Sequence, residues 1–584
     1  MSIYTTLKMK FWKNWLKIST LKIAYAFTII LNSVCILLGV FYTLTSNYSI
    51  FWDIFGVILL ITLFGNLILI FSQTIRNFRG NKINSKMNLF SYFYLVFIIL
   101  TMVCLMLGNL LISVTYSNRL IDNAAGYTLI YLFYFGNLIV GIIYAIYGFK
   151  TYNILKVKFE EIEFNKNFSR RFLKTKRILK KVITIVSRTV FIIGIVFGLV
   201  MVVGSFEFVT TFIAIVSGQF GIFFSIIFFA NTILLLKLKY SKLSSKKFNR
   251  TAVSGILVSG LLLSPLFITH LTINDIESNF AAMFGPDWKE KIPEEVEEYF
   301  LETPFSLSSY FLGVPPKDCK IERDILFYND EGIRLYFDAY MPLDSEKSLP
   351  GANSTIIRIH GGSWVSGDKG LMNMMQMNKY FAAQGYVVFD IQYGLDENPL
   401  YILDPLTPAY QKGDFNIDDM VRHIGEFTKY LSGHADDFGA NIKSVFISGG
   451  SAGGHLTCAS ALAIASGEYT DLFSTDLNIN GMIPFYPAND LMNFFGITGS
   501  DEFRNPEKLI RSDSPPCLIF QGTHDIINYF GICKDIQNTY YSKGNGNCAI
   551  LWMPFGGHAS DIYFTGYYNQ IFLYYMERFM YLNH

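Results

Sequence analysis

A serine flanked by glycines lies in the second half of the chain, between an apolar run and a helical pattern. Gly449-Gly450-Ser451-Ala452-Gly453 directly follows the β-branched run at 444–448 and overlaps the start of the helical pattern at 452–466. A strand, a tight turn and a helix hold a serine on a strained backbone, where small neighbours are needed to clear the adjacent chain. The pattern predicts that Ser451 is a nucleophile.

A second glycine-rich motif, His360-Gly361-Gly362-Ser363-Trp364, directly follows the apolar run at 354–359. When a nucleophile attacks an ester, the carbonyl oxygen becomes an oxyanion, and glycines allow backbone N–H groups to point at it. We expect Gly361 and Gly362 to supply one or two donors, and the amide of Ala452 another. The alternative, an ordinary glycine-rich loop, is disfavoured by the serine turn about ninety residues downstream.

A serine nucleophile also needs a base and an acid that orients the base, in the chain order Ser, Asp, His on this kind of sheet. Asp525 lies just after the apolar run at 517–521, and His558 just after the run at 548–553. The predicted triad is Ser451, Asp525 and His558, and acyl transfer through it requires no metal or organic cofactor. The alternatives for the acid and base are, in chain order, His455, His524 and Asp561.

These motifs together make residues 319–584 resemble an α/β-hydrolase of the hormone-sensitive-lipase-like and feruloyl-esterase-like carboxylesterase group, which includes bacterial acetyl esterases and arylformamidases. The matching stretches are the motif at 360–364, the segment 448–456, the Gly522-x-x-Asp525 strand end and the Gly557-His558 turn. The resemblance implies hydrolysis of a carboxylic ester, and it covers no part of residues 1–271.

Two positions depart from the pattern of that group. Gly450 stands before the nucleophile, where many members carry an acidic residue, and Gln392 stands where many carry arginine. The first departure favours the feruloyl-esterase-like branch. The second predicts that the loop after this strand is held in a different way.

The elements around the motifs alternate between strands and helices. Strands are predicted at 319–328, 333–341, 354–359, 386–393, 444–448, 480–486, 517–521 and 548–553. Helical patterns lie at 371–384, 414–432, 452–466, 531–542 and 561–580. Two early strands followed by repeated strand and helix units predict an α/β fold with a mostly parallel sheet, in which ligands bind at the carboxyl ends of the strands.

The first 271 residues are of a different kind. Apolar windows of the length that crosses a bilayer, about 20 residues, recur there. We predict an all-α membrane bundle of seven spans near 21–44, 50–72, 89–115, 125–149, 182–204, 207–236 and 251–271. The first window is too long for a simple signal peptide and is followed by further spans, so we expect it to stay in the protein.

Charge divides the chain at the same place. Residues 1–271 hold 28 Lys and Arg against 6 Asp and Glu, a net charge of +22, whereas residues 272–584 carry −20. The cations lie between apolar runs and form no basic stripe, which favours a lipid bilayer over nucleic acid as the partner. Basic segments at 1–22, 73–88, 150–181 and 237–250 alternate with segments that hold only Arg119. The positive-inside rule therefore predicts a cytoplasmic N-terminus and an extracytoplasmic second half.

The expected organisation is a membrane domain at 1–271, a linker or cap at 272–318 with a short helix after Pro293, and a catalytic domain at 319–584. The function expected is a membrane-tethered serine carboxylesterase or deacylase whose substrate is a lipid, a glycan acetyl group or a small-molecule ester. A serine peptidase or amidase, and a receptor or scaffold with an inactive hydrolase domain, remain as alternatives. Seven cysteines without a CxxC pair predict no disulfide framework and at least one free thiol.

Overall fold

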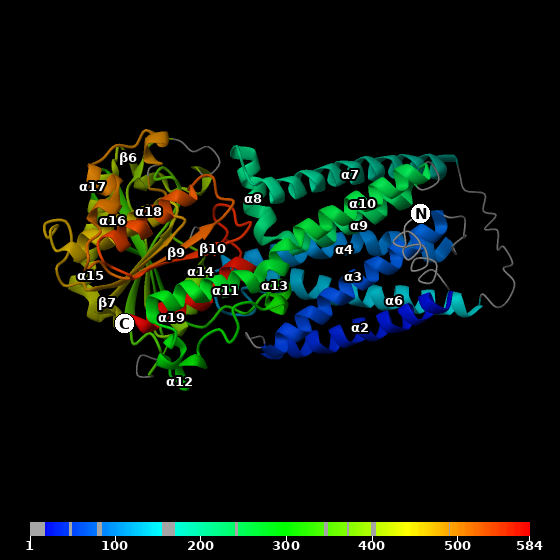
Figure 1. Ribbon diagram of the computed structural model, residues 1–584, viewed down its shortest axis with the longest axis horizontal. Coiled ribbons are helices and arrows are strands. Elements are labelled where there is room, and N and C mark those ends of the chain that lie inside the picture. The colour runs from blue at the N-terminus through cyan, green and yellow to red at the C-terminus, as the bar shows by residue number, and fades with distance from the viewer. Residues whose placement is uncertain are drawn as a thin grey trace.

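The structure is a computed structural model that describes residues 18–45, 50–78, 85–154, 170–239, 243–343, 348–370, 373–398, 404–489 and 491–584. A bundle of long helices occupies one end of the molecule and a sheet covered by helices the other (Figure 1). Residues 1–17, and parts of the basic segments at 73–88, 150–181 and 237–250, lie outside the described residues. So do the first two residues of the helical pattern at 371–384.

The N-terminal region is mostly helical, with non-helical connections that include residues 114–123 and 204–207. Its elements are α2 (Ile18–Thr45), α3 (Ile50–Phe78), α4 (Ser85–Ser113), α5 (Ala124–Tyr127), the π-helix η1 (Thr128–Leu132), α6 (Phe133–Ile154), α7 (Arg170–Val203), α8 (Phe208–Gln219), α9 (Gly221–Lys239), α10 (Ser245–Leu262) and α11 (Ser264–Phe284). Within the described ranges, seven helical segments are long and apolar enough to cross a membrane. The prediction of a helical region with seven apolar segments long enough to span a membrane is therefore confirmed by helix length and composition.

The sixth predicted span, 207–236, is two helices instead of one. The chain leaves α-helical geometry at Phe220, so α8 is a separate apolar helix of 12 residues before the 19-residue α9. Glu207 caps α8 in a reciprocal arrangement with Thr210. An apolar helix this short is typical of an interfacial or re-entrant segment. Hydropathy alone merged the two helices because both are apolar.

The last span also differs from its predicted bounds. The chain bends between α10 and α11, where Ser264 and Pro265 begin the second helix. Pro265 favours a new start because proline is tolerated in the first turn of a helix and breaks a helix interior. Helix α11 then continues to Phe284, past residue 271, and Asn279 donates a hydrogen bond to the carbonyl of Ile550 in the sheet.

The C-terminal half contains an eight-stranded sheet in the order β1-β2-β4-β3-β7-β8-β9-β10. Its strands are β1 (Lys320–Asp330), β2 (Ile333–Met341), β3 (Ser354–Ile359), β4 (Val387–Ile391), β7 (Asn441–Gly450), β8 (Ile479–Phe485), β9 (Cys517–Gly522) and β10 (Cys548–Met553). Strands β1 and β2 are antiparallel neighbours, β2 pairs antiparallel with β4, and the pairs from β4 to β10 are parallel. The mostly parallel α/β sheet predicted from the alternating pattern is therefore confirmed.

Helices cover both faces of this sheet. The longer ones are α14 (Met375–Ala383), α15 (Ile417–Phe438), α16 (Ala452–Ser466), α18 (Phe530–Ser542) and α19 (Tyr567–Leu582). Along β3, Ile357 belongs to one apolar core with α15, α16 and α18, whereas Ile356 belongs to a second core with α14 and α19. Successive side chains of a strand point to opposite faces, which explains this division.

The remaining elements are short. They are η3 (Trp288–Lys291), α12 (Glu294–Glu297), α13 (Leu307–Leu312), η4 (Asp404–Leu406), η5 (Ala409–Gln411), η6 (Met492–Phe495), α17 (Asp501–Arg504) and η7 (Pro506–Leu509), with the small strand pair β5 (Leu395–Asp396) and β6 (Lys412–Gly413). Helix α12 is the short helix expected after Pro293.

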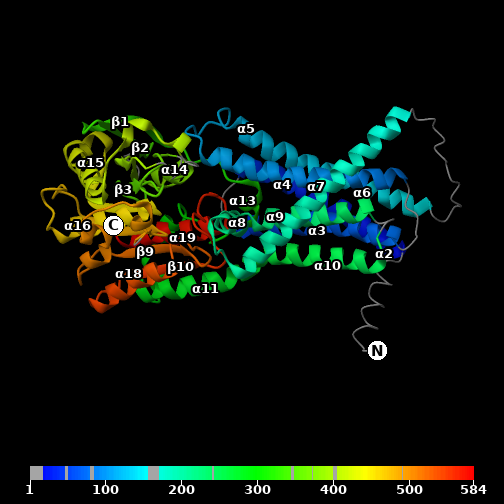
Figure 2. The ribbon, with the colours of Figure 1, turned by 90° about the horizontal axis from the view of Figure 1, so that it is seen from above.

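Helix α13 joins the two parts of the molecule, as the view from above shows (Figure 2). All six of its residues are buried, and it contacts α3 and α4 of the bundle. The Tyr42 hydroxyl donates to the carbonyl of Gly313 at 2.6 Å, and the amide of Asn109 donates to the carbonyl of Phe311. The second sheet core, with α14 and α19, is continuous with the core of the bundle. The aromatic segment at 305–311 therefore packs at the junction.

Candidate active site

The structure brings Ser451, His558 and Asp525 together at the carboxyl ends of β7, β10 and β9. His558 Nε2 lies 3.0 Å from Ser451 Oγ, and His558 Nδ1 lies 2.9 Å from Asp525 Oδ2. Asp525 is buried, while Ser451 keeps part of its surface exposed. A nucleophile beside a base that a buried carboxylate orients is the arrangement needed for nucleophilic acyl transfer.

Close backbone packing explains the glycines around Ser451. The serine has a φ of 58°, in the left-handed region that non-glycine residues rarely adopt. A Cβ at Gly449 would lie 2.4 Å from the carbonyl oxygen of Ile359, and one at Gly453 would lie 2.1 Å from the same atom. These two glycines let the turn approach the end of β3. The strand, the turn and helix α16 together fix the position of the Ser451 hydroxyl.

Asp525 is held in place by its own turn. The backbone N–H groups of Ile527 and Asn528 each donate to Asp525 Oδ1 at 2.9 Å. The other carboxylate oxygen faces His558. One oxygen is therefore used to orient the carboxylate and the other to orient the imidazole.

The three alternative residues lie elsewhere. Asp561 Oδ1 accepts a hydrogen bond from the Tyr486 hydroxyl at 2.6 Å, and burial raises the pKa of this carboxyl. His455 Nε2 lies 2.8 Å from the carbonyl oxygen of Phe503, and burial lowers its pKa to about 4. His524 Nε2 lies 3.2 Å from the carbonyl oxygen of Met201 in α7.

The loop after β3 lies beside the serine turn. A Cβ at Gly361 would be 2.7 Å from the carbonyl oxygen of Gly450 and 3.4 Å from Ser451 Cβ. Gly362 has a φ of 127°, and a Cβ there would collide with the carbonyl oxygen of Ser366. Ala452 is the first residue of α16. The three residues predicted to donate to an oxyanion thus belong to two segments that meet at Ser451.

His360 and Trp364 are packing residues of this loop. His360 stacks on Tyr393, with ring centroids 4.6 Å apart, and burial lowers its pKa to about 4. Trp364 is fully buried and contacts the rings of His455 and Phe495 edge-on. Trp364 therefore packs in the interior of the domain.

Tyr486 is a residue of the site that sequence reasoning missed. Its ring packs against His558, with centroids 4.7 Å apart, while its hydroxyl bonds Asp561. Its carbonyl accepts from the side-chain amide of Asn528, the residue whose backbone also holds Asp525. The only sequence signal was its place at the end of the strand after the serine turn.

The two departures from the family pattern have structural counterparts. Gln392 donates to Asp368 at 2.6 Å and accepts from the backbone N–H of Tyr336, so it ties the loop after β3 to β2. A Cβ at Gly450 would lie 2.8 Å from the Tyr486 hydroxyl. Tyr486 thus occupies the space beside the serine turn that a side chain at 450 would need.

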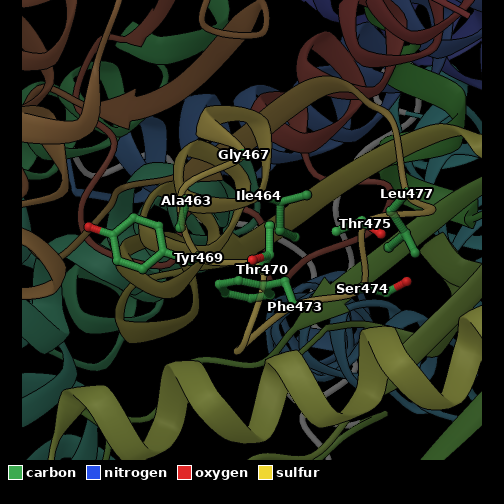
Figure 3. Close-up of a pocket in the computed structure, with 9 residues that line it drawn as sticks. All are labelled: Ala463, Ile464, Gly467, Tyr469, Thr470, Phe473, Ser474, Thr475 and Leu477. Atoms are coloured by element: carbon green, nitrogen blue, oxygen red, sulfur yellow. The ribbon is translucent and has the colours of Figure 1, made fainter.

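A small surface pocket of about 100 Å³ lies away from this centre (Figure 3). Its lining comes from the end of α16 and the segment that follows, including Ala463, Gly467, Tyr469 and Leu477. Ser451 precedes the other end of this 15-residue helix, which is about 22 Å long. The pocket therefore takes no part in the arrangement around Ser451.

Comparison with known proteins relates the C-terminal half to esterases. Residues 337–509 match the BD-FAE family. Esterase LipC of Mycobacterium tuberculosis is 20% identical over 269 residues, which are 41% of this chain. The chain spans 60% of the length of that curated relative.

Two esterases of known structure are also similar. Esterase 2 of Thermogutta terrifontis in its apo form is 22% identical, with 45% of this chain and 91% of that one covered and a TM-score of 0.34. Inhibited esterase B from Lactobacillus rhamnosis is 20% identical, with 42% and 81% covered and a TM-score of 0.34. Residues 337–509 therefore match a BD-FAE domain, of the hormone-sensitive-lipase-like and feruloyl-esterase-like kind, and the C-terminal half of this chain is similar to relatives named as esterases.

Proposed function

We propose that this protein is a membrane-tethered serine carboxylesterase that uses Ser451, His558 and Asp525 as its catalytic triad. The observation that carries the proposal is the pair of contacts made by His558, 3.0 Å to Ser451 Oγ and 2.9 Å to Asp525 Oδ2. The membrane spans connect this centre to the bilayer.

The mechanism is acyl transfer in two steps. Ser451 Oγ attacks the ester carbonyl while His558 Nε2 takes its proton and passes it to the leaving alcohol. Water then attacks the acyl-enzyme, with His558 again as the base, and the acid is released. Asp525 holds the imidazole in the useful tautomer and stabilises its charge. The amides of Gly361, Gly362 and Ala452 are the proposed donors to the oxyanion.

Two alternatives fit the molecule less well. A peptidase of this fold would usually bring a propeller or a site for a peptide amine, and the segment 272–318 contains only the end of α11 and short helices. A receptor or scaffold with an inactive hydrolase domain would have no need to keep Ser451 and His558 at hydrogen-bond distance.

The purified full-length protein is expected to hydrolyse a p-nitrophenyl ester faster than the p-nitroanilide of the same acyl group. The ester is the substrate class that the relatives' names share, and p-nitrophenolate, a weak base, departs without the protonation that the amine of an anilide requires. A series of acyl groups from acetyl to long-chain would define the length preference. Preferential cleavage of the anilide would support the amidase alternative.

We further propose that the catalytic domain is extracytoplasmic. Four cation-rich segments, at 1–22, 73–88, 150–181 and 237–250, alternate with nearly cation-free ones, and the opposite orientation would place all four on the wrong side. With a cytoplasmic N-terminus and an odd number of spans, the acidic half lies on the extracytoplasmic side of the membrane, away from the anionic cytoplasmic leaflet.

Protease added to intact cells or spheroplasts should degrade an epitope placed after His584 and spare one placed within 150–181. Permeabilised cells, in which both epitopes become accessible, are the control. If the C-terminal epitope resisted protease until the membrane was opened, the catalytic domain would be cytoplasmic.

A further inference from the structure

The carboxyl ends of the parallel strands face the membrane bundle, and the loop that carries Asp525 contacts it directly. The Ser205 hydroxyl, in the turn between α7 and α8, donates to the carbonyl of His524 at 2.7 Å. The ring of His524 lies 3.2 Å from the carbonyl oxygen of Met201, near the end of α7. The residue next to Asp525 is therefore held through both its backbone and its side chain by the end of a membrane helix.

The loop that carries His558 lies against α8. A Cβ at Gly557 would be 2.8 Å from the backbone N of Ile215, and one at Gly218 would be 2.7 Å from the carbonyl oxygen of Phe555. The side chain of Gln219 donates to the carbonyl of Ala559 at 3.4 Å. Helix α8 and the His558 loop are thus in backbone-to-backbone contact.

The third catalytic loop, after β3, contacts the connection between α4 and α5. The Tyr116 hydroxyl donates to Asp338 of β2 at 2.7 Å. The same hydroxyl lies 2.9 Å from where a Cβ at Gly370 would be. All three loops that converge on Ser451 therefore touch the ends of the bundle, and the site lies at the junction of the two parts instead of on the distant face of the domain.

An apolar surface adjoins this junction. We define the apolar rim as the exposed side chains Val202, Val203, Phe206, Val209 and Phe212, which run from the end of α7 into α8 and flank the exposed Glu207 at the start of α8. Phe206 is 71% and Val209 60% exposed. The rim continues the exposed apolar face of α7, where Leu199 and Val196 precede it. A surface continuous with that face of a spanning helix meets the acyl chains of the surrounding leaflet.

We propose that the substrate is an amphiphilic ester resident in the adjoining leaflet, whose acyl chain lies along the apolar rim while its ester group reaches Ser451. The inference rests on the proposed esterase function and narrows its substrate class to lipids. The ester groups of membrane lipids lie near the boundary of headgroups and acyl chains, which is also the depth reached by short interfacial helices. The Asp525 and His558 loops contact the α7 end and α8 themselves, so an ester at this depth needs little displacement from the bilayer.

The test uses the full-length protein in phosphatidylcholine vesicles with two probes, p-nitrophenyl acetate in water and p-nitrophenyl palmitate in the bilayer. Phe206→Asp and Val209→Asp are each expected to lower the palmitate rate relative to the acetate rate by about tenfold, because a carboxylate on the rim disfavours contact with acyl chains. Phe206→Leu, which keeps the rim apolar, should retain the wild-type ratio. Leu343→Asp is the matched control, since Leu343 is 68% exposed but follows β2, which neighbours β1 at the edge of the sheet opposite β10.

The acetate rate shows whether each variant is folded and active. An unchanged ratio in both aspartate variants would overturn the inference and leave the esterase function standing. If the aspartate variants lose the acetate rate, the wild-type protein provides the test instead. The inference then requires that the wild type hydrolyse vesicle-bound p-nitrophenyl palmitate faster than p-nitrophenyl butyrate in water at the same total concentration. The reverse order would overturn the inference. Hydrolysis of neither ester by the wild type would overturn the proposed function and the inference with it.

Discussion

Replacing Ser451 by alanine is expected to lower ester turnover by about 10⁶, because the members of a triad act as a unit and removing the nucleophile abolishes their joint contribution. Hydrolysis of a short p-nitrophenyl ester by the purified full-length protein measures the effect. Among the described residues the hydroxyl makes no hydrogen bond other than that with His558 Nε2, so the variant should fold and insert as the wild type does.

Ser448 provides a matched control for this substitution. It is a buried serine on β7, three residues before Ser451, and its hydroxyl accepts from Arg358 instead of a catalytic group. Ser448→Ala leaves a buried N–H of the Arg358 guanidinium without its acceptor, at a cost of about 1–3 kcal/mol in stability, and should leave most of the turnover. Turnover within tenfold of the wild type in Ser451→Ala would remove this serine from the mechanism.

Changing Asp525 to asparagine is expected to lower turnover by about 10⁴. The amide preserves the shape of the side chain but presents the wrong hydrogen-bonding partner to His558 Nδ1, which disfavours the tautomer that accepts the Ser451 proton. The acceptor role toward Ile527 and Asn528 can remain with the other oxygen. Turnover of the same p-nitrophenyl ester is the measurement.

Asp561→Asn separates the two candidate acids. Asp561 bonds the Tyr486 hydroxyl, and Tyr486 packs on His558, so this change acts on the base only through a neighbouring ring. We expect a much smaller loss than in Asp525→Asn. A large loss in Asp561→Asn together with near-normal turnover in Asp525→Asn would make Asp561 the orienting acid.

Short apolar runs in the sequence were sufficient to predict the strands and the motif residues that follow them. Each of the eight strands predicted in the second half has a counterpart within a few residues. The glycines at 449 and 453 also carried information, since their spacing reflects the approach of the serine turn to Ile359. A motif that depends on backbone geometry within one strand, one turn and one helix can be recognised from a single segment.

Contacts between distant segments could not be predicted in the same way. The place of Tyr486 at a strand end was too weak a signal, because an aromatic residue there is ordinary in a chain with 16% aromatic residues. The break at Phe220 was hidden because hydropathy remains high across it. The contacts of Ser205 with His524 and of Gly557 with α8 join residues more than 300 positions apart. Hydrophobic periodicity within one segment therefore cannot predict them. These contacts place the site beside the ends of α7 and α8 in the helical bundle.

The most direct test of the central claim is the covalent trapping of the nucleophile. The full-length protein would be treated with a fluorophosphonate, digested, and the adducted peptide identified by mass spectrometry. We expect one phosphonylated residue, Ser451, with labelling lost on denaturation and much slower in Asp525→Asn because His558 no longer activates the hydroxyl. Labelling at another serine, or no labelling of folded wild-type protein, would contradict the assignment of this domain as a serine esterase centred on Ser451.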